Sequence, residues 1–362
     1  MVTTSGEHDR YLPHVDGLRA LAVLVVVLFH VHVPGFGGGF VGVDVFLVIS
    51  GFLITRLITR ELTETGSFRF GRFYLRRIRR LGPALLVTSA VVLVAAAILQ
   101  SPGVLERTGA ELVASTLSVS NFYFWLNADY FAVDQWTRPM LHTWSLSLEE
   151  QFYLVWPLTL LVAARCGGRR AVVVAVAALT AASLALNPLF ADGAPAWARS
   201  WLPEVAQDGK PTLFFMLPFR VFEFAIGGLL SMCGTSTTST GRGAALGFGG
   251  LLMILASALT YDERMVFPSW AGLLPCLGTA LAIHHGHQGL CGRLLANRIA
   301  TWIGRISYSV YLVHWPIIAL HYYVAGRPDA FAQAWIVGGS LLLGHLSWRF
   351  VETPFRHKRI PL

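Results

Sequence analysis

The strongest constraint on how this chain can fold is a series of long apolar runs that recurs from one end to the other. Ten such runs cover residues 18–33, 40–58, 83–100, 148–164, 171–190, 212–232, 243–260, 270–285, 302–324 and 332–350. A helix that crosses a bilayer needs about 20 predominantly apolar residues. The chain is 54% hydrophobic and 13% charged, whereas average proteins carry about 25% charged residues. The sequence therefore predicts an all-α polytopic integral membrane protein. It excludes a soluble enzyme, a disordered scaffold and a disulfide-rich secreted module.

The positive charges indicate how many runs cross the membrane. The net charge of +8 comes mostly from arginines in short segments between the runs. If an eleventh, serine-rich run at 110–127 also crossed, the segments 165–170 and 291–305 would face outside, against the positive-inside rule. Without that crossing, every arginine-rich loop lies on one side. We therefore expect about ten transmembrane helices with both termini cytoplasmic. Abundant Arg, Ala, Val and Gly are typical of a GC-rich bacterium, so we expect its cytoplasmic membrane and no nucleic-acid partner.

The chain is expected to form one domain over residues 1–362. Residues 101–147 make the longest external segment, which is rich in aromatic residues and is predicted to lie at the membrane interface. Residues 351–362 form a cytoplasmic tail. The four cysteines form no CxxC pattern, so neither a metal site nor a disulfide framework is expected.

Arg19 and His30 are the most informative polar residues inside the first run. They are eleven positions apart, which places them on one helix face about 16 Å apart along the axis. Ionisable side chains within a bilayer are costly, and each is a functional candidate. A guanidinium near the cytoplasmic end and a deeper imidazole suit a donor that carries phosphates, with histidine as the general base. In the structural alternative, Arg19 binds anionic lipid and His30 bonds a carbonyl of a neighbouring helix.

Acidic residues at the outer ends of two runs are candidates to orient His30. Asp44 enters the membrane at a depth similar to that of His30, and Glu149 and Glu150 begin the run at 148. A carboxylate beside an imidazole can orient it and favour the imidazolium. Both places have a structural alternative, because Asp44 can cap its helix and Ser147 with Glu150 fits a capping box.

Two further groups of polar residues follow helical spacing. Arg220 and Glu223 stand at i and i+3 and are expected to pair with each other or with other spans, as a structural link. Ser307, Tyr311 and His314 follow i, i+4 and i+7, which places them along one helix face.

A basic segment at 69–80 lies between the second and third runs. Its densest part holds Arg76, Arg77, Arg79 and Arg80. Such a segment is most often a topology determinant that contacts lipid head groups. It can also bind the phosphates of a cytoplasmic co-substrate.

Six stretches along the chain resemble the membrane-bound acyltransferase-3 family, which includes bacterial O-antigen acetylases. In order, they are YLPHVDGLRALAVLVVVLFH…GGFVGVDVFLVISGFLIT (11–55), RRIRRLGP (76–83), LHTWSLSLEEQFYLVWP (141–157), FRVFEFAIG (219–227), ISYSVYLVHWP (306–316) and RFVETPFR (349–356). Some family members carry an SGNH hydrolase-like domain after the last span. This sequence stops just past RFVETPFR, so we expect either a stand-alone membrane domain or a truncation.

The resemblance implies a multi-span enzyme that moves an acyl group, usually acetyl, from acyl-CoA to a hydroxyl of a sugar or related acceptor. Acyl-CoA would be a co-substrate, with no permanently bound cofactor and no metal. Three family elements fall on residues of this chain: Arg-x10-His on Arg19 and His30; the paired glycines on Gly38 and Gly39, or on the adjoining Gly37; and RxxR on Arg76–Arg79 or Arg77–Arg80.

We therefore predict an O-acyltransferase, of the class that transfers groups other than amino-acyl groups, acting on a cell-surface glycan such as lipopolysaccharide or a wall polymer. His30 would be the catalytic base, with Asp44 or Glu149 orienting it. Its partners would be acyl-CoA, the sugar acceptor and membrane lipid, and the sequence does not indicate an oligomeric state. Alternative acceptors are a macrolide or another glycosylated secondary metabolite. Alternative classes are a transporter or flippase and a non-catalytic receptor.

Overall fold

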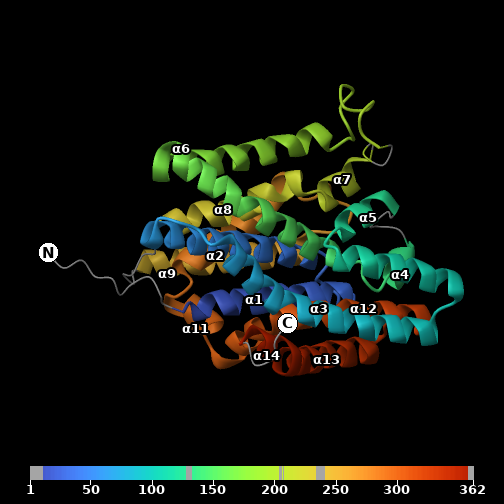
Figure 1. Ribbon diagram of the computed structural model, residues 1–362. Helices are drawn as coiled ribbons and strands as arrows, with labels where there is room; N and C mark the ends of the chain where they lie inside the picture. The colour runs from blue at the N-terminus through green and yellow to red at the C-terminus, as the bar shows by residue number, and fades with distance from the viewer. Residues whose placement is uncertain (1–10, 128–132, 204–205, 207, 234–240, 358–362) are drawn as a thin grey trace.

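The computed structural model describes residues 11–127, 133–203, 206, 208–233 and 241–357. Over these residues the fold is helical without a β-strand, as the sequence predicts, and the long helices lie side by side in one bundle (Figure 1). In chain order the elements are α1 (Pro13–His30), η1 (Gly39–Val41), α2 (Gly42–Thr65), α3 (Phe70–Leu99), α4 (Pro102–Thr116), α5 (Ser120–Asn127), η2 (Val133–Thr137), α6 (Thr143–Phe190), α7 (Gly209–Phe215), α8 (Leu217–Met232), α9 (Gly241–Thr260), η4 (Trp270–Gly272), α10 (Leu273–His285), α11 (Gly289–Leu295), α12 (Arg298–Ala325), α13 (Ala330–Ser347), η5 (Trp348–Glu352) and α14 (Thr353–Arg356).

The bundle has two distinct ends. α4, α5 and α7 lie at one end, and α11 and the turn within α6 lie at the other (Figure 1). These are called the α5 end and the α11 end below. α1 begins beside α11, because a Cβ placed on Gly17 would lie 2.0 Å from the carbonyl oxygen of Leu295. His30, the last residue of α1, therefore points toward the α5 end.

Six helical stretches among the described residues are long and apolar enough to cross a membrane: Pro13–His30, Gly39–Thr65, Phe70–Leu99, Thr143–Phe190, Gly241–Thr260 and Ala330–Arg356. A seventh candidate is the pair α7 and α8, which meet at a bend of 42°. The prediction of a multi-pass helical membrane protein is thus confirmed. Helix length and hydropathy alone do not identify ten membrane crossings, so the number ten stays a prediction.

α6 holds two of the predicted runs in one 48-residue helix that is broken in the middle. At about 1.5 Å per residue, a straight helix of this length would far exceed the ~30 Å hydrocarbon core. The break falls at Gly167 and Gly168, where Gly168 adopts φ +61° and ψ −149°. A side chain at this backbone conformation would be strained, so glycine fits it. The two arms of α6 meet there at the α11 end (Figure 1).

The serine-rich run at 110–127 is divided between two short helices. α4 has 15 residues and α5 has 8, and Ser118 between them has φ +58°. Each helix is shorter than the about 20 residues that a crossing needs. Both lie at the α5 end (Figure 1).

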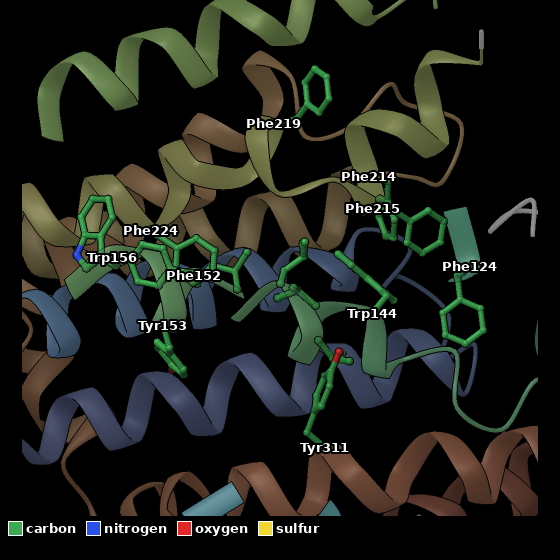
Figure 2. Packing of buried hydrophobic residues seen from close by; sticks show 14 of the residues in the cluster. Phe124, Trp144, Phe152, Tyr153, Trp156, Phe214, Phe215, Phe219, Phe224 and Tyr311 are labelled. Atoms are coloured by element: carbon green, nitrogen blue, oxygen red, sulfur yellow. The ribbon is translucent and has the colours of Figure 1, made fainter. Parts of the chain in front are cut away.

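A layer of aromatic side chains joins α6 to α7 and α8. Phe152 stacks on Phe224 with centroids 4.0 Å apart, and Trp144 packs on Phe214 at 4.4 Å (Figure 2). The indole Nε1 of Trp156 donates a 2.7 Å hydrogen bond to Thr55 on α2. Such aromatic pairs contribute about 0.5–1.5 kcal/mol each beyond the area they bury. The layer fixes the wall of α6 that faces the site described next.

Candidate active site

The imidazoles of His30 and His314 form a buried pair between α1 and α12. Nδ1 of His30 lies 3.0 Å from Nε2 of His314, and the two rings are nearly parallel at 12° with centroids 5.2 Å apart. His30 is 5% exposed and His314 is fully buried. Both residues are candidates from the sequence, but their positions in it do not indicate that they pair.

The surroundings of this pair fix where its protons lie. Nδ1 of His314 is 2.7 Å from the backbone carbonyl of Tyr311, and a carbonyl only accepts, so this nitrogen carries the proton. Nε2 of neutral His314 is then a hydrogen-bond acceptor, and the Nδ1–H group of His30 donates to it. Neutral His30 is left with an unprotonated Nε2. A histidine held in this tautomer is prepared to accept a proton.

Two more aromatic residues complete the wall around the pair. The ring of His142 lies 5.6 Å from that of His314, centroid to centroid, and Trp315 meets the His30 ring edge-on at 4.5 Å. Nε1 of Trp315 donates a 2.7 Å hydrogen bond to the carbonyl of Arg138. His142 and Trp315 lie inside the family-like stretches at 141–157 and 306–316, but neither was a candidate from the sequence.

A basic cavity lies within the bundle, between the histidine pair and the α11 end. The side chains that line it come from α1, α2, α3, α6 and α12, and they are Arg19, Val43, Phe46, Leu47, Ser50, Arg77, Arg80, Leu81, Ser145, Leu146, Glu149, Tyr153, Ser307, Tyr308 and Tyr311. Three arginines against one glutamate make this cavity positive. Guanidinium groups bind phosphate and carbonyl oxygens through directed hydrogen bonds.

The cavity distinguishes between the two possible positions of the RxxR element. Arg77 lies over the Tyr153 ring, with its guanidinium carbon 4.5 Å from the centroid, and together with Arg80 it lines the cavity. Arg76 instead pairs with Glu61 at 4.0 Å and lines a separate groove between α1, α2 and α3. Neither Arg76 nor Arg79 is among the cavity-lining residues. The position Arg77–Arg80 is therefore the one directed inward.

Glu149 faces the cavity and does not contact the histidine pair. Its carboxylate accepts hydrogen bonds from the hydroxyls of Ser50 and Tyr153. The suggested capping box of Ser147 and Glu150 is wrong, because α6 begins four residues earlier, at Thr143. Ser147 is bonded to Ser120 on α5 at 2.8 Å instead.

Asp44 does not orient His30, and this part of the prediction is corrected. Its Oδ1 accepts a 3.1 Å hydrogen bond from Arg220, whose same nitrogen donates to Glu223 at 3.0 Å. All three side chains are buried. A buried guanidinium without an acidic partner would be strongly destabilising, and the two carboxyl groups supply that partner. The expected pairing of Arg220 with Glu223 is confirmed. Asp44 is not the N-cap of α2 either, because Val41 holds that position and Asp44 lies within the first turn.

Gly38 and Gly39 pack against neighbouring helices and do not line the basic cavity. A Cβ on Gly38 would lie 2.2 Å from the carbonyl oxygen of Ser257, and one on Gly39 would lie 2.2 Å from that of Val25. The backbone N–H of Gly38 donates to the carbonyl of Ala258 at 3.0 Å. The structure thus gives these glycines a close-packing role between helices.

Tyr311 connects the basic cavity with the histidine pair. Its hydroxyl is 2.7 Å from that of Ser145 at the cavity wall, and its ring lies 5.2 Å from that of His314, centroid to centroid. As predicted, Ser307, Tyr311 and His314 lie along one face of α12, and this face runs from the cavity to the histidine pair. The first two line the cavity, and the third bonds His30.

Together these features define a multi-pass membrane protein with an internal basic cavity that leads to a buried imidazole pair. The chain belongs to the acyltransferase-3 family, whose acyltransferase domain matches residues 12–346. This confirms the family that the sequence motifs indicate.

The curated relatives are named as O-acetyltransferases. The chain is 30% identical to the peptidoglycan O-acetyltransferase OatA of Listeria monocytogenes, over 98% of this chain and 57% of the relative. It is 30% identical to the putative peptidoglycan O-acetyltransferase YrhL of Bacillus subtilis, over 97% of the chain and 56% of the relative. A putative O-acetyltransferase of Staphylococcus aureus strain COL is 29% identical, over 97% and 58%. The chain thus spans a little more than half the length of these relatives. No solved structure matches it.

Proposed function

We propose that this chain is a membrane O-acyltransferase that moves an acetyl group from acetyl-CoA to a hydroxyl of a cell-wall glycan. The observation that carries the proposal is the continuous arrangement of basic cavity, Tyr311 and the His30–His314 pair. The family and the names of the relatives support acetyl transfer. They favour a wall glycan over the secondary metabolites and the transport function considered from the sequence.

In this proposal the donor binds from the cytoplasm at the α11 end. Arg19, Arg77 and Arg80 supply the positive charge that acyl-CoA phosphates require. The ten predicted runs cross the membrane and both termini are cytoplasmic, in the cytoplasmic membrane of a bacterium. The break of α6 supports this topology, because its arginines lie at the α11 end, and Arg169 donates a 2.6 Å hydrogen bond to the carbonyl of Met232 at the end of α8.

His30 acts as the general base. Its free Nε2 takes the proton of the acceptor hydroxyl as that oxygen attacks the thioester carbonyl. The carbon–sulfur bond then breaks, and the CoA thiolate takes the proton back from His30. The products are the acetyl ester and CoA–SH, so no covalent enzyme intermediate is needed. His314 holds the imidazole in the required tautomer throughout.

The experiment is an acetyl-transfer assay with the purified protein in lipid nanodiscs, using radiolabelled acetyl-CoA and soluble peptidoglycan fragments. The expected product is a labelled fragment whose label is released by mild alkali, as an ester requires. Label that stays in acetyl-CoA or appears only as free acetate would contradict the proposal.

A further inference from the structure

Three half-buried aromatic rings gather at the α5 end, next to the histidine pair. They are His32 in the loop after α1, Trp136 in η2 and Tyr322 in the last turns of α12, and we call them the aromatic platform. The His32 and Trp136 centroids are 4.3 Å apart, and Trp136 stacks on Tyr322 at 5.4 Å with 23° between the rings. Nε2 of His32 is 2.9 Å from the Tyr322 hydroxyl.

The aromatic platform is continuous with the candidate base through Trp315. The Trp315 ring lies 5.4 Å from that of Trp136 on one side and 4.5 Å from that of His30 on the other. Its hydrogen bond to the carbonyl of Arg138 fixes the loop after η2 to α12. A molecule held on the platform is therefore one aromatic ring away from His30.

The backbone at His32 adopts an uncommon conformation. His32 has φ +59°, a conformation that is costly for most residues and free for glycine. The position nevertheless carries an imidazole, held by Tyr322 and, through its carbonyl, by a 3.4 Å hydrogen bond from Gln333.

The platform differs from the aromatic residues that anchor a protein at the membrane interface. Such residues expose most of their surface, as Trp197, Trp201 and Trp270 do here with exposed fractions of 70%, 86% and 59%. The platform rings instead pack on one another and on the buried Trp315. They are only partly exposed, and they combine aromatic carbons with hydroxyl, imidazole and indole groups. A pyranose has the matching chemistry, with C–H faces and a rim of hydroxyls.

We propose that the aromatic platform binds a sugar ring of the acceptor glycan and presents its hydroxyl to His30. The inference rests on the proposed function, because it places the acceptor opposite the donor cavity. The acceptor then binds at the α5 end of the bundle, and acyl-CoA enters at the α11 end.

The test is direct binding of soluble peptidoglycan fragments by isothermal titration calorimetry, in nanodiscs and without acetyl-CoA. Trp136→Leu removes the central ring, and Trp270→Leu is the matched control at an exposed tryptophan outside the platform. We expect Trp136→Leu to weaken binding about tenfold or more, while Trp270→Leu binds as the wild type does. Tyr322→Phe removes only the hydroxyl that His32 contacts, and it is expected to weaken binding several-fold in a fully folded protein.

Binding and transfer separate this inference from the proposed function. The proposal that the platform binds sugar would be wrong if the wild-type protein bound no fragment. It would also be wrong if the variants at Trp136 and Tyr322 bound fragments as tightly as the wild type. If the fragments bind as expected but receive no acetyl group, the proposed function fails while the sugar site stands. Acetyl-CoA binding should be equal in the wild type and all three variants.

Discussion

His30 and His314 are 284 positions apart in the sequence, yet one 3.0 Å hydrogen bond defines how both can act. In the proposed mechanism His314 is a positioning residue, because its Nε2 accepts a hydrogen bond from Nδ1–H of His30. His314→Leu removes the acceptor, and we expect acetyl transfer to fall by about tenfold to a hundredfold, as for other hydrogen-bond partners that orient a functional imidazole. His314→Gln supplies an amide oxygen and should recover part of this loss. Equal rates in the two variants, at equal melting temperatures, would show that His314 only fills space.

The arginines of α3 differ in the direction they face, which provides both a test variant and a control. Arg77 and Arg80 line the cavity, whereas Arg76 on the same helix faces the neighbouring groove and Glu61. Arg77→Ala with Arg80→Ala should raise the KM for acetyl-CoA at least tenfold, since charge-assisted hydrogen bonds contribute about 1.5–3 kcal/mol each. Arg76→Ala should change it less than threefold. If Arg76→Ala has the larger effect, the donor binds in the groove and not in the cavity.

At the scale of elements, the break of α6 depends on a glycine backbone. Gly168 adopts a conformation that costs other residues about 1–3 kcal/mol, so Gly168→Ala should lower the melting temperature in detergent. Gly338 in α13 is helical, and a Cβ there meets nothing within 4 Å. Gly338→Ala should therefore be neutral or stabilising. An unchanged melting temperature for Gly168→Ala would mean that the break is not fixed by this residue.

Helices were more predictable from sequence than the contacts between them. The apolar runs predict helices because crossing a bilayer demands a local property, namely length and hydropathy. The pair Arg220 and Glu223 was predictable because i and i+3 lie on one helix face. The partners of His30 and Asp44 come from distant helices, and local spacing says nothing about them. The capping box failed because α6 extends past its local signal, held by packing of Thr143 and Trp144.

At the scale of the whole molecule, the topology is open to a labelling test. Cys166 at the break of α6 and Cys233 after α8 are both exposed, and the Arg169 bond to Met232 places them at the same end. A membrane-impermeant maleimide should leave both unlabelled in intact cells and label both after permeabilisation. Trp201→Cys, in the exposed loop before α7, should be labelled in intact cells. Labelling of Cys166 from outside would contradict ten crossings with cytoplasmic termini.

In the proposed mechanism His30 removes the acceptor proton, while the arginines of the cavity hold the donor elsewhere in the bundle. The most direct measurement is the rate of acetyl transfer to glycan fragments by His30→Ala, together with its affinity for acetyl-CoA. We predict a loss of about a hundredfold or more in rate, the scale expected for a general base, with unchanged affinity for acetyl-CoA. A His30→Ala protein that transfers acetyl within a few-fold of the wild-type rate would contradict the account.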